Sequence, residues 1–264
     1  MPILFQSLFD ALYTMPLVGV IFWSLVENII ILLVCLVVGH WLVAHYQQHP
    51  ITEAPEPLTA TEIWLAVSCV LLNSLVTIIG IYLWRNQFII VDFSLSVVRI
   101  VVDVIVLLMV MDLGMYVFHR LAHHKWLYPI IHRTHHLFEN PRPLTLFVLN
   151  PFEVLGFGGL WLVVLVVYSA NWLSIILYLT LNIVFGLVGH LGVEPMPSAW
   201  INLPFIRYIS TSTFHAEHHM DDGHNFGFYT LIWDRLFGTL SPDYLSDFTN
   251  ARHGIAIQNA EDVG

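Results

Sequence analysis

Residues 97–123 read VVRIVVDVIVLLMVMDLGMYVFHRLAH, a long apolar run that ends in two histidines four residues apart. About 20 apolar residues in a helix cross the hydrocarbon core of a bilayer, so this run predicts a membrane span over Val97–Phe118. Residues three or four apart share one face of a helix. His119 and His123 are therefore expected to point the same way just beyond the span. This stretch predicts both a helical membrane protein and imidazoles gathered at one membrane face.

The rest of the chain extends the same pattern. It is 57% hydrophobic and 11% charged, with a mean hydropathy of +0.74, whereas soluble domains carry about 25% charged residues. Four further runs predict spans, giving about five in all: Pro16–Val38, Ile63–Trp84, Phe152–Tyr168 and Trp172–Leu191. A very short turn at Ala170 joins the last two spans into a helical hairpin. We expect one all-α domain over 1–264, a multi-pass transmembrane helical bundle.

The remaining segments are more polar. The first fifteen residues either lie along the membrane interface or extend the first span, and the segment Gln47–Glu62 is a connector. From Met196 onward we expect a helical cap on the membrane face, followed by a loose polar tail over 247–264. The catalytic region is predicted over 97–240.

Composition also excludes several classes. A net charge of -10 without a Lys/Arg-rich tract argues against nucleic-acid binding. Cys35 and Cys69 both lie in apolar runs, so neither a disulfide framework nor a thiolate metal site is expected. A basic segment before the first apolar run is missing, so a cleaved signal peptide is not expected.

The basic residues predict an orientation. Seven of the nine Lys and Arg residues follow the third or the fifth predicted span. The hairpin places those two segments on the same side, and positively charged segments favour the cytoplasm. We therefore expect an integral membrane protein whose histidine face is cytoplasmic.

Two more histidine clusters and one single histidine fall on that side. They are His132-Arg-Thr-His135-His136, His215-Ala-Glu-His218-His219 and, at the end of the hairpin, His190. Helical spacing predicts that each trio converges. Nine imidazoles exceed the four ligands of one tetrahedral site and suit two ions. Imidazole binds Zn, Cu, Fe and Ni, and of these we favour iron because it adds oxygen activation.

At these residues the chain resembles the fatty acid hydroxylase/sterol desaturase superfamily. The resemblance runs from about Asp112 to Leu240 and includes Asn225-Phe-Gly and Trp233-Asp-Arg-Leu-Phe-Gly-Thr239. It implies a membrane-bound non-haem di-iron enzyme that hydroxylates or desaturates lipids with O2 and two external electrons. The implied metal ligands are His119, His123, His132, His135, His136, His190, His215, His218 and His219. With no nucleotide-binding motif visible, the electrons are expected from a separate ferredoxin or cytochrome donor.

Two carboxylates are candidate functional residues. Fatty-acid 2-hydroxylase-like members carry a second histidine four residues after the position of His190, where this chain has Glu194. Sterol-oxidising members resemble this chain there, which favours a sterol-like substrate. Glu194 is open to three roles: ligand, nearby base or helix cap. Asp112 lies two helical turns before His119 and is expected to accept a hydrogen bond from the far nitrogen of His119 or His123. The alternative is a structural hydrogen bond within the bundle.

Other polar residues are assigned less specific roles. Asp234 and Arg235 are expected either to orient a ligand histidine or to hold the cap. His124 points about 100° away from His123 around the helix and is not expected to bind metal. The direction of His224, beyond Gly223, is not set by the sequence.

Two other classes of function stay open. A zinc-dependent membrane hydrolase is one, although the His-Glu-x-x-His pattern of metalloproteases is missing. A metal-binding or transport protein without catalysis is the other, although the histidines gather at one face and do not line the spans. The lipid, the carbon attacked, the choice between hydroxylation and desaturation, and the oligomeric state do not follow from the sequence.

Overall fold

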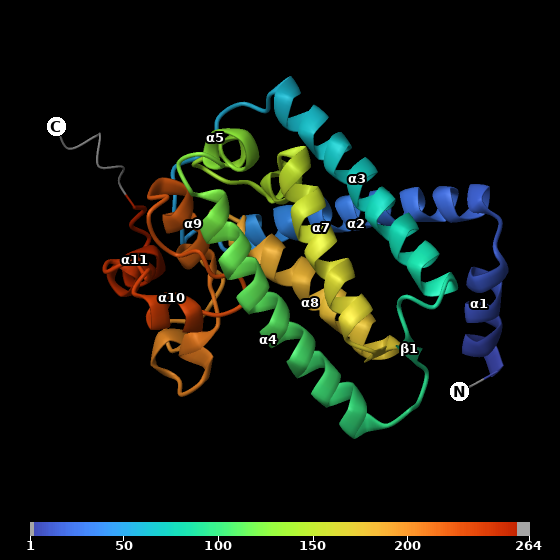
Figure 1. The fold of residues 1–264 in the computed structure, drawn as a ribbon. Helices are drawn as coiled ribbons and strands as arrows, with labels where there is room; N and C mark the ends of the chain where they lie inside the picture. The colour runs from blue at the N-terminus through green and yellow to red at the C-terminus, as the bar shows by residue number, and fades with distance from the viewer. Residues whose placement is uncertain (1–2, 258–264) are drawn as a thin grey trace.

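A computed structural model describes residues 3–257 of the chain, with the backbone alone for residues 3–6 and 8. Five long helices pack together. They are α2 (Leu17–His45), α3 (Ala60–Arg85), α4 (Val97–Ala122), α7 (Pro151–Val167) and α8 (Trp172–Gly189). Helix α2 crosses the others at an angle (Figure 1). The predicted all-α class is confirmed.

Four of these helices are long and apolar enough to cross a membrane, namely α2, α3, α4 and α8. The fifth predicted span corresponds to α7, which has 17 residues and is therefore about 26 Å long at 1.5 Å per residue. That length falls short of a hydrocarbon core of about 30 Å. α8, with 18 residues, is only about 1.5 Å longer, so the two arms of the predicted hairpin are nearly equal in length.

The outer surfaces of these helices are apolar. In the most apolar 18-residue windows of the four spans, only 22–33% of the residues are buried inside the protein. Val98 and Val18, for example, are largely exposed. An apolar surface of this extent is costly in water, so it indicates a helical membrane protein whose solvent there is lipid.

Polar residues set where the helices begin. Thr59 and Glu62 form a capping box at the start of α3, in which each side chain bonds the other's backbone N–H. The side chain of Asn150 accepts from the N–H of Phe152 at the start of α7, and Pro151 occupies the first helical position. These caps stand at the end of the bundle that carries the histidines.

The opposite end of the bundle carries a short helix and a pair of short strands. α1 (Ile3–Thr14) is a helix separate from α2, with Pro16 preceding the first residue of α2. The proposed extension of the first span is therefore wrong. Strands β1 (Val91–Asp92) and β2 (Ala170–Asn171) pair in parallel beside the hairpin turn.

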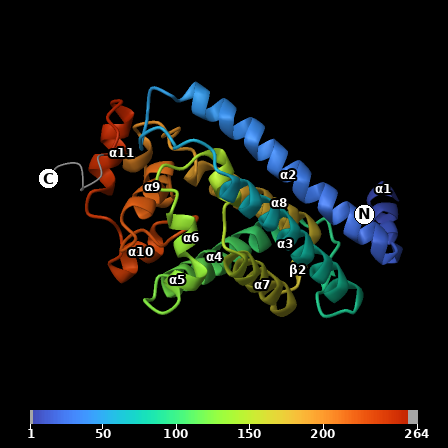
Figure 2. The ribbon, with the colours of Figure 1, turned by 90° about the horizontal axis from the view of Figure 1, so that it is seen from above.

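Short helices form the predicted cap at the other end of the long helices, far from α1 (Figure 2). They are α5 (Tyr128–Ile131), α6 (Arg133–His136), η1 (Pro143–Phe147), η2 (Trp200–Asn202), η3 (Ile206–Tyr208), α9 (Ser212–Met220), α10 (Ile232–Phe237) and α11 (Tyr244–Arg252). The prediction of a loose tail from 247 is wrong as far as residue 252. That segment belongs to α11, because Phe248 and Ala251 are apolar and buried. Residues 258–264 of the predicted tail lie outside the described residues.

Candidate metal centre

All nine predicted histidines lie together where the ends of α4 and α8 meet the cap, in two groups. Within each group, the ring nitrogens that face one another all lie within 4.8 Å. Histidine group one consists of His119, His123, His132, His136 and His218, and histidine group two of His135, His190, His215 and His219. The nine residues come from four separate segments of the chain, 119–123, 132–136, 190 and 215–219, so the centre depends on the tertiary fold.

The prediction that each histidine trio converges is wrong in one respect. His132 and His136 belong to group one, whereas His135 between them belongs to group two. α9 divides in the same manner, with His215 and His219 in group two and His218 in group one. Successive residues of a helix differ by about 100° in direction. Two histidines four residues apart therefore face the same group, while the histidine that lies between them in the sequence faces the other group.

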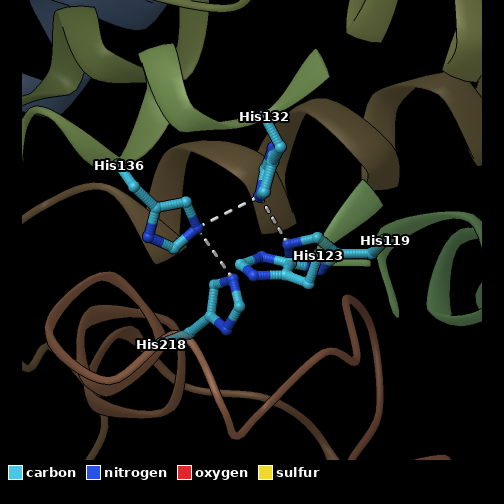
Figure 3. Close-up of side chains that lie close together, drawn as sticks. All are labelled: His119, His123, His132, His136 and His218. Atoms are coloured by element: carbon cyan, nitrogen blue, oxygen red, sulfur yellow. Dashed lines mark hydrogen bonds between the residues drawn. The ribbon is translucent and has the colours of Figure 1, made fainter. Parts of the chain in front are cut away.

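In group one, the Nε2 atoms converge (Figure 3). The distance between Nε2 of His119 and Nε2 of His132 is 2.8 Å. Nε2 of His136 lies 3.1 Å from Nε2 of His132 and 3.1 Å from Nε2 of His218. Nε2 of His123 is buried and has no hydrogen-bond partner.

Group two has the same character. Nε2 of His190 lies 3.3 Å from Nε2 of His135 and 3.1 Å from Nε2 of His215. Nε2 of His219 lies 3.3 Å from Nε2 of His215. Ligand nitrogens bound about 2.1 Å from one ion stand roughly 3.0–3.4 Å apart at tetrahedral or octahedral angles. The observed separations largely match that spacing.

Backbone carbonyls fix which ring nitrogen carries the proton. Nδ1 of His119 donates to the carbonyl of Phe226 at 2.9 Å, and Nδ1 of His135 to the carbonyl of Val148 at 3.1 Å. Nδ1 of His190 donates in the same manner to Gly186, one turn earlier in α8. A neutral imidazole has one N–H, so the Nε2 atom of each ring presents a lone pair to its group.

The positions of the ring protons indicate whether a cation fits between the rings. His135 and His190 turn two lone pairs toward each other at 3.3 Å, which cannot be a hydrogen bond between neutral rings. Uncompensated lone pairs repel in a buried site, whereas a metal ion would bind both. The donor set of each group therefore fits a divalent transition metal, for which imidazole is a common ligand.

Burial keeps these rings neutral. Desolvation lowers the pKa of His135 to about 4 and the pKa of His190 to about 3. It lowers the pKa of His123 to about 3, and the neighbouring histidines add to the effect. Metal ligands must be deprotonated, so both groups are ready to bind metal at neutral pH.

Glu153 is a neighbour of the centre that the sequence did not reveal. Its Oε1 lies 2.9 Å from Nδ1 of His132, and both side chains are almost completely buried. A carboxylate at the far nitrogen of a ligand histidine sets the tautomer and raises the basicity of the ring. Glu153 is not among the functional residues predicted from the sequence. One feature of the sequence pointed to the centre, namely that Glu153 lies on the histidine side of the membrane.

Asp112 makes different contacts from those predicted. Its oxygens accept from the N–H and hydroxyl of Thr230, the N–H of Tyr229 and the indole of Trp233. The hydrogen bond predicted to His119 or His123 is wrong, because Nδ1 of His119 bonds the Phe226 carbonyl instead. Asp112 fastens the cap to α4.

The Asn-Phe-Gly and Trp-Asp-Arg segments form one polar assembly. Asp234 accepts from the N–H groups of Phe226 and Gly227 and from the hydroxyl of Thr239. A Cβ atom on Gly227 would stand 2.5 Å from a backbone oxygen, so only glycine fits there. Of the two roles predicted for Asp234, it holds the loop, and that loop presents the Phe226 carbonyl to His119.

Glu194 acts as a helix cap in this structure. Its Oε2 accepts from the N–H and the hydroxyl of Thr213 in the first turn of α9, and its Oε1 from the N–H of Met196. The side chain is fully buried. Among the three roles left open, the cap is the one whose contacts are present. It orients the helix that supplies ligands to both groups.

His124 and His224 lie outside both groups. His124 is exposed, in line with its direction around the helix. Nδ1 of His224 bonds Asp221, and its backbone carbonyl accepts from Nδ1 of His218 at 2.6 Å. His224 therefore supports a candidate ligand through its backbone.

A small cavity of about 10 Å³ opens beside group two. Its wall combines candidate ligands with apolar residues and includes His190, His215, Phe185, Val188 and Phe228. That volume holds about one water-sized molecule.

Comparison with known proteins adds independent evidence. The sequence model described as fatty acid hydroxylase matches residues 104–239, which include all nine histidines. The chain is 29% identical to lathosterol oxidase of Homo sapiens over 153 residues, covering 56% of the chain and 48% of that protein. It is 29% identical to methylsterol monooxygenase 1 of Rattus norvegicus, covering 48% and 43%.

A third relative aligns over a longer stretch. Cholesterol 25-hydroxylase-like protein of Danio rerio is 27% identical over 186 residues, covering 68% of the chain and 73% of that protein. The chain spans about half the length of the lathosterol oxidases that it matches. No solved structure matches significantly.

Proposed function

Because the chain belongs to the fatty acid hydroxylase family, we propose that it is a lipid oxidoreductase of the membrane. It holds two iron ions, one in each histidine group, and oxidises an unactivated C–H bond with O2 and electrons from an external donor. The observation that carries this proposal is the pair of histidine groups, whose Nε2 lone pairs face one another at 2.8–3.3 Å.

The chain's own residues would prepare each site. Backbone carbonyls hold His119, His135 and His190 in the tautomer that leaves Nε2 free. Burial keeps the rings neutral and excludes water. Iron bound there would supply oxygen activation, and the protein would supply geometry and placement.

We propose a sterol-like or fatty acyl substrate. The names of the relatives refer to lathosterol, methylsterol and cholesterol, which favours a sterol. Phe185, Val188 and Phe228 line the cavity of about 10 Å³ beside group two, which would have to widen to admit a hydrocarbon from the bilayer. Placement would select the carbon, since a strong oxidant attacks what it can reach.

The first experiment is metal analysis of the detergent-purified protein, together with turnover. We expect two irons per chain, and O2-dependent oxidation of a sterol when a reductant and a ferredoxin or cytochrome donor are added. Mass spectrometry of the product distinguishes an added oxygen from a loss of two hydrogens. Zinc alone, with hydrolysis of a lipid ester and no O2 consumption, would refute the proposal.

A further inference from the structure

The cap carries an exposed apolar face that the metal centre does not use. It is formed by the segment 203–205 and by α10, and we call it the α10 face. Its exposed side chains are Leu203, Phe205, Ile232, Leu236 and Phe237. In a water-facing cap these exposed apolar side chains would be costly, and exposed apolar patches mark membrane or protein contacts.

The position of α10 along α4 sets its depth. The indole of Trp233 donates to Asp112, and the ring of Phe237 stacks on Tyr116 at 5.4 Å. Those α4 residues lie ten and six positions before its last residue, Ala122, which is about 15 and 9 Å below the helix end. α10 therefore lies beside the span and not above it (Figure 1).

That depth belongs to the hydrocarbon. α4 has 26 residues and is about 39 Å long, whereas the apolar core of a bilayer is about 30 Å thick. At the level of Asp112 and Tyr116, the surface of α4 is apolar, with Leu113 and Val117 exposed. The α10 face continues this lipid-facing surface.

Phe205 gives a second sign of an external contact. Its side chain is 85% exposed, and its backbone has a φ of +66°, a region that bulky residues rarely adopt. The protein itself gains little from holding an aromatic ring in this position. Insertion of the ring into lipid would supply the missing stabilisation.

Two arginines stand beside this face. The guanidinium carbons of Arg207 and Arg235 lie 5.1 and 5.2 Å from the centre of the same ring, that of Tyr208. Neither guanidinium forms an ion pair with a carboxylate in the part of the chain that the structure describes. Both are exposed. Guanidinium groups bind phosphate through paired hydrogen bonds, and arginines next to apolar residues reach toward the lipid headgroups.

We propose that the α10 face inserts into the leaflet on the histidine side, and that Arg207 and Arg235 bind the phosphate of an anionic glycerophospholipid. The contact would hold the cap against the bilayer at a fixed height. This inference concerns a lipid that is not oxidised, and it does not depend on the proposed reaction.

The depth is tested with nitroxide labels on the full chain in nanodiscs. Leu236→Cys carries the label on the α10 face, and Leu245→Cys is the matched control, an exposed leucine on α11. The native Cys35 and Cys69 are buried. We expect the label at 236 to be reached by dissolved oxygen and shielded from a water-soluble nickel chelate, and the label at 245 to show the reverse. A label at 236 reached freely by the chelate would overturn the proposal. Shielding from both reagents would also overturn it, because a second protein copy would then cover the face.

The headgroup site is tested separately by lipid preference. Spin-labelled phosphatidylglycerol and phosphatidylcholine are compared for the fraction held at the protein surface. We expect the wild type to prefer phosphatidylglycerol. The preference should fall about fivefold for each arginine removed in Arg207→Gln and Arg235→Gln, and it should persist in the control Lys125→Gln. A preference that is absent, or unchanged in the double variant, would refute the headgroup site.

Discussion

Replacing Glu153 should weaken iron binding at group one. Its Oε1 lies 2.9 Å from Nδ1 of His132, and neither side chain is more than 3% exposed. Glu153→Gln keeps an oxygen beside Nδ1 of His132 but can carry no negative charge. Glu153→Ala removes the whole carboxyl group and leaves the buried Nδ1 of His132 without a polar neighbour, at a cost of about 1–3 kcal/mol.

These changes translate into metal affinity. Loss of a carboxylate behind a ligand histidine costs about 10- to 100-fold in affinity, so we expect about tenfold for Glu153→Gln and about 100-fold for Glu153→Ala. The assay is chelator titration of the iron-loaded protein, with iron per chain measured at each step. His132 belongs to group one, so the iron of group one should be released first, while group two keeps its iron.

The chain offers a matched control. Glu62 is also a buried glutamate at the third position of a helix, on the same side of the membrane, and it pairs with Arg142 at 3.2 Å. Glu62→Gln removes a comparable charge at a helix start but touches no histidine. It should lower the melting temperature and leave iron affinity unchanged. The reasoning is refuted if Glu153→Gln binds iron as the wild type does, or if Glu62→Gln loses iron equally.

Three further outcomes are expected. His135→Ala should reduce iron from two to about one per chain and abolish turnover, whereas His124→Ala should leave both unchanged in the same metal analysis. Glu194→Ala removes a fully buried cap and should destabilise the fold by about 1–3 kcal/mol, read from chemical denaturation of the metal-free protein. The pKa values of His135 and His190 are lowered from 6.5 to about 4 and about 3, so below pH 6.5 the unfolded state binds more protons. The metal-free protein should therefore lose stability as the pH falls from 6.5 to 4, and a melting temperature independent of pH in that range would contradict this.

The long helices were predictable because their signal is local. The run over Val97–Phe118 is apolar over its whole length, and α4 covers it as Val97–Ala122. The gathering of nine histidines on one side followed from the same counting of spans. The predicted run Phe152–Tyr168 likewise agrees with α7 to within one residue at each end.

The contacts around the histidines were not predictable, because they join distant segments. The Phe226 carbonyl that orients His119 is 107 positions away in sequence, and no local pattern marks a backbone acceptor. Asp112 was predicted to bond a histidine because it shares a helical face with His119. Its four donors instead belong to residues 229–233, whose path over α4 depends on the folded cap.

The division of each trio makes the two histidine groups mechanically dependent on each other. α9 sends His218 to group one and His215 and His219 to group two, and residues 132–136 divide in the same manner. A small rotation of α9 about its axis therefore displaces ligands of both groups at once. Glu194 fixes the first turn of α9 through Thr213, so its removal should loosen both irons together, unlike the selective loss expected from Glu153→Gln. Chelator titration of the two variants distinguishes these patterns: one joint release for Glu194→Ala and two separate releases for Glu153→Gln. Separate releases in both variants would show that α9 does not couple the groups.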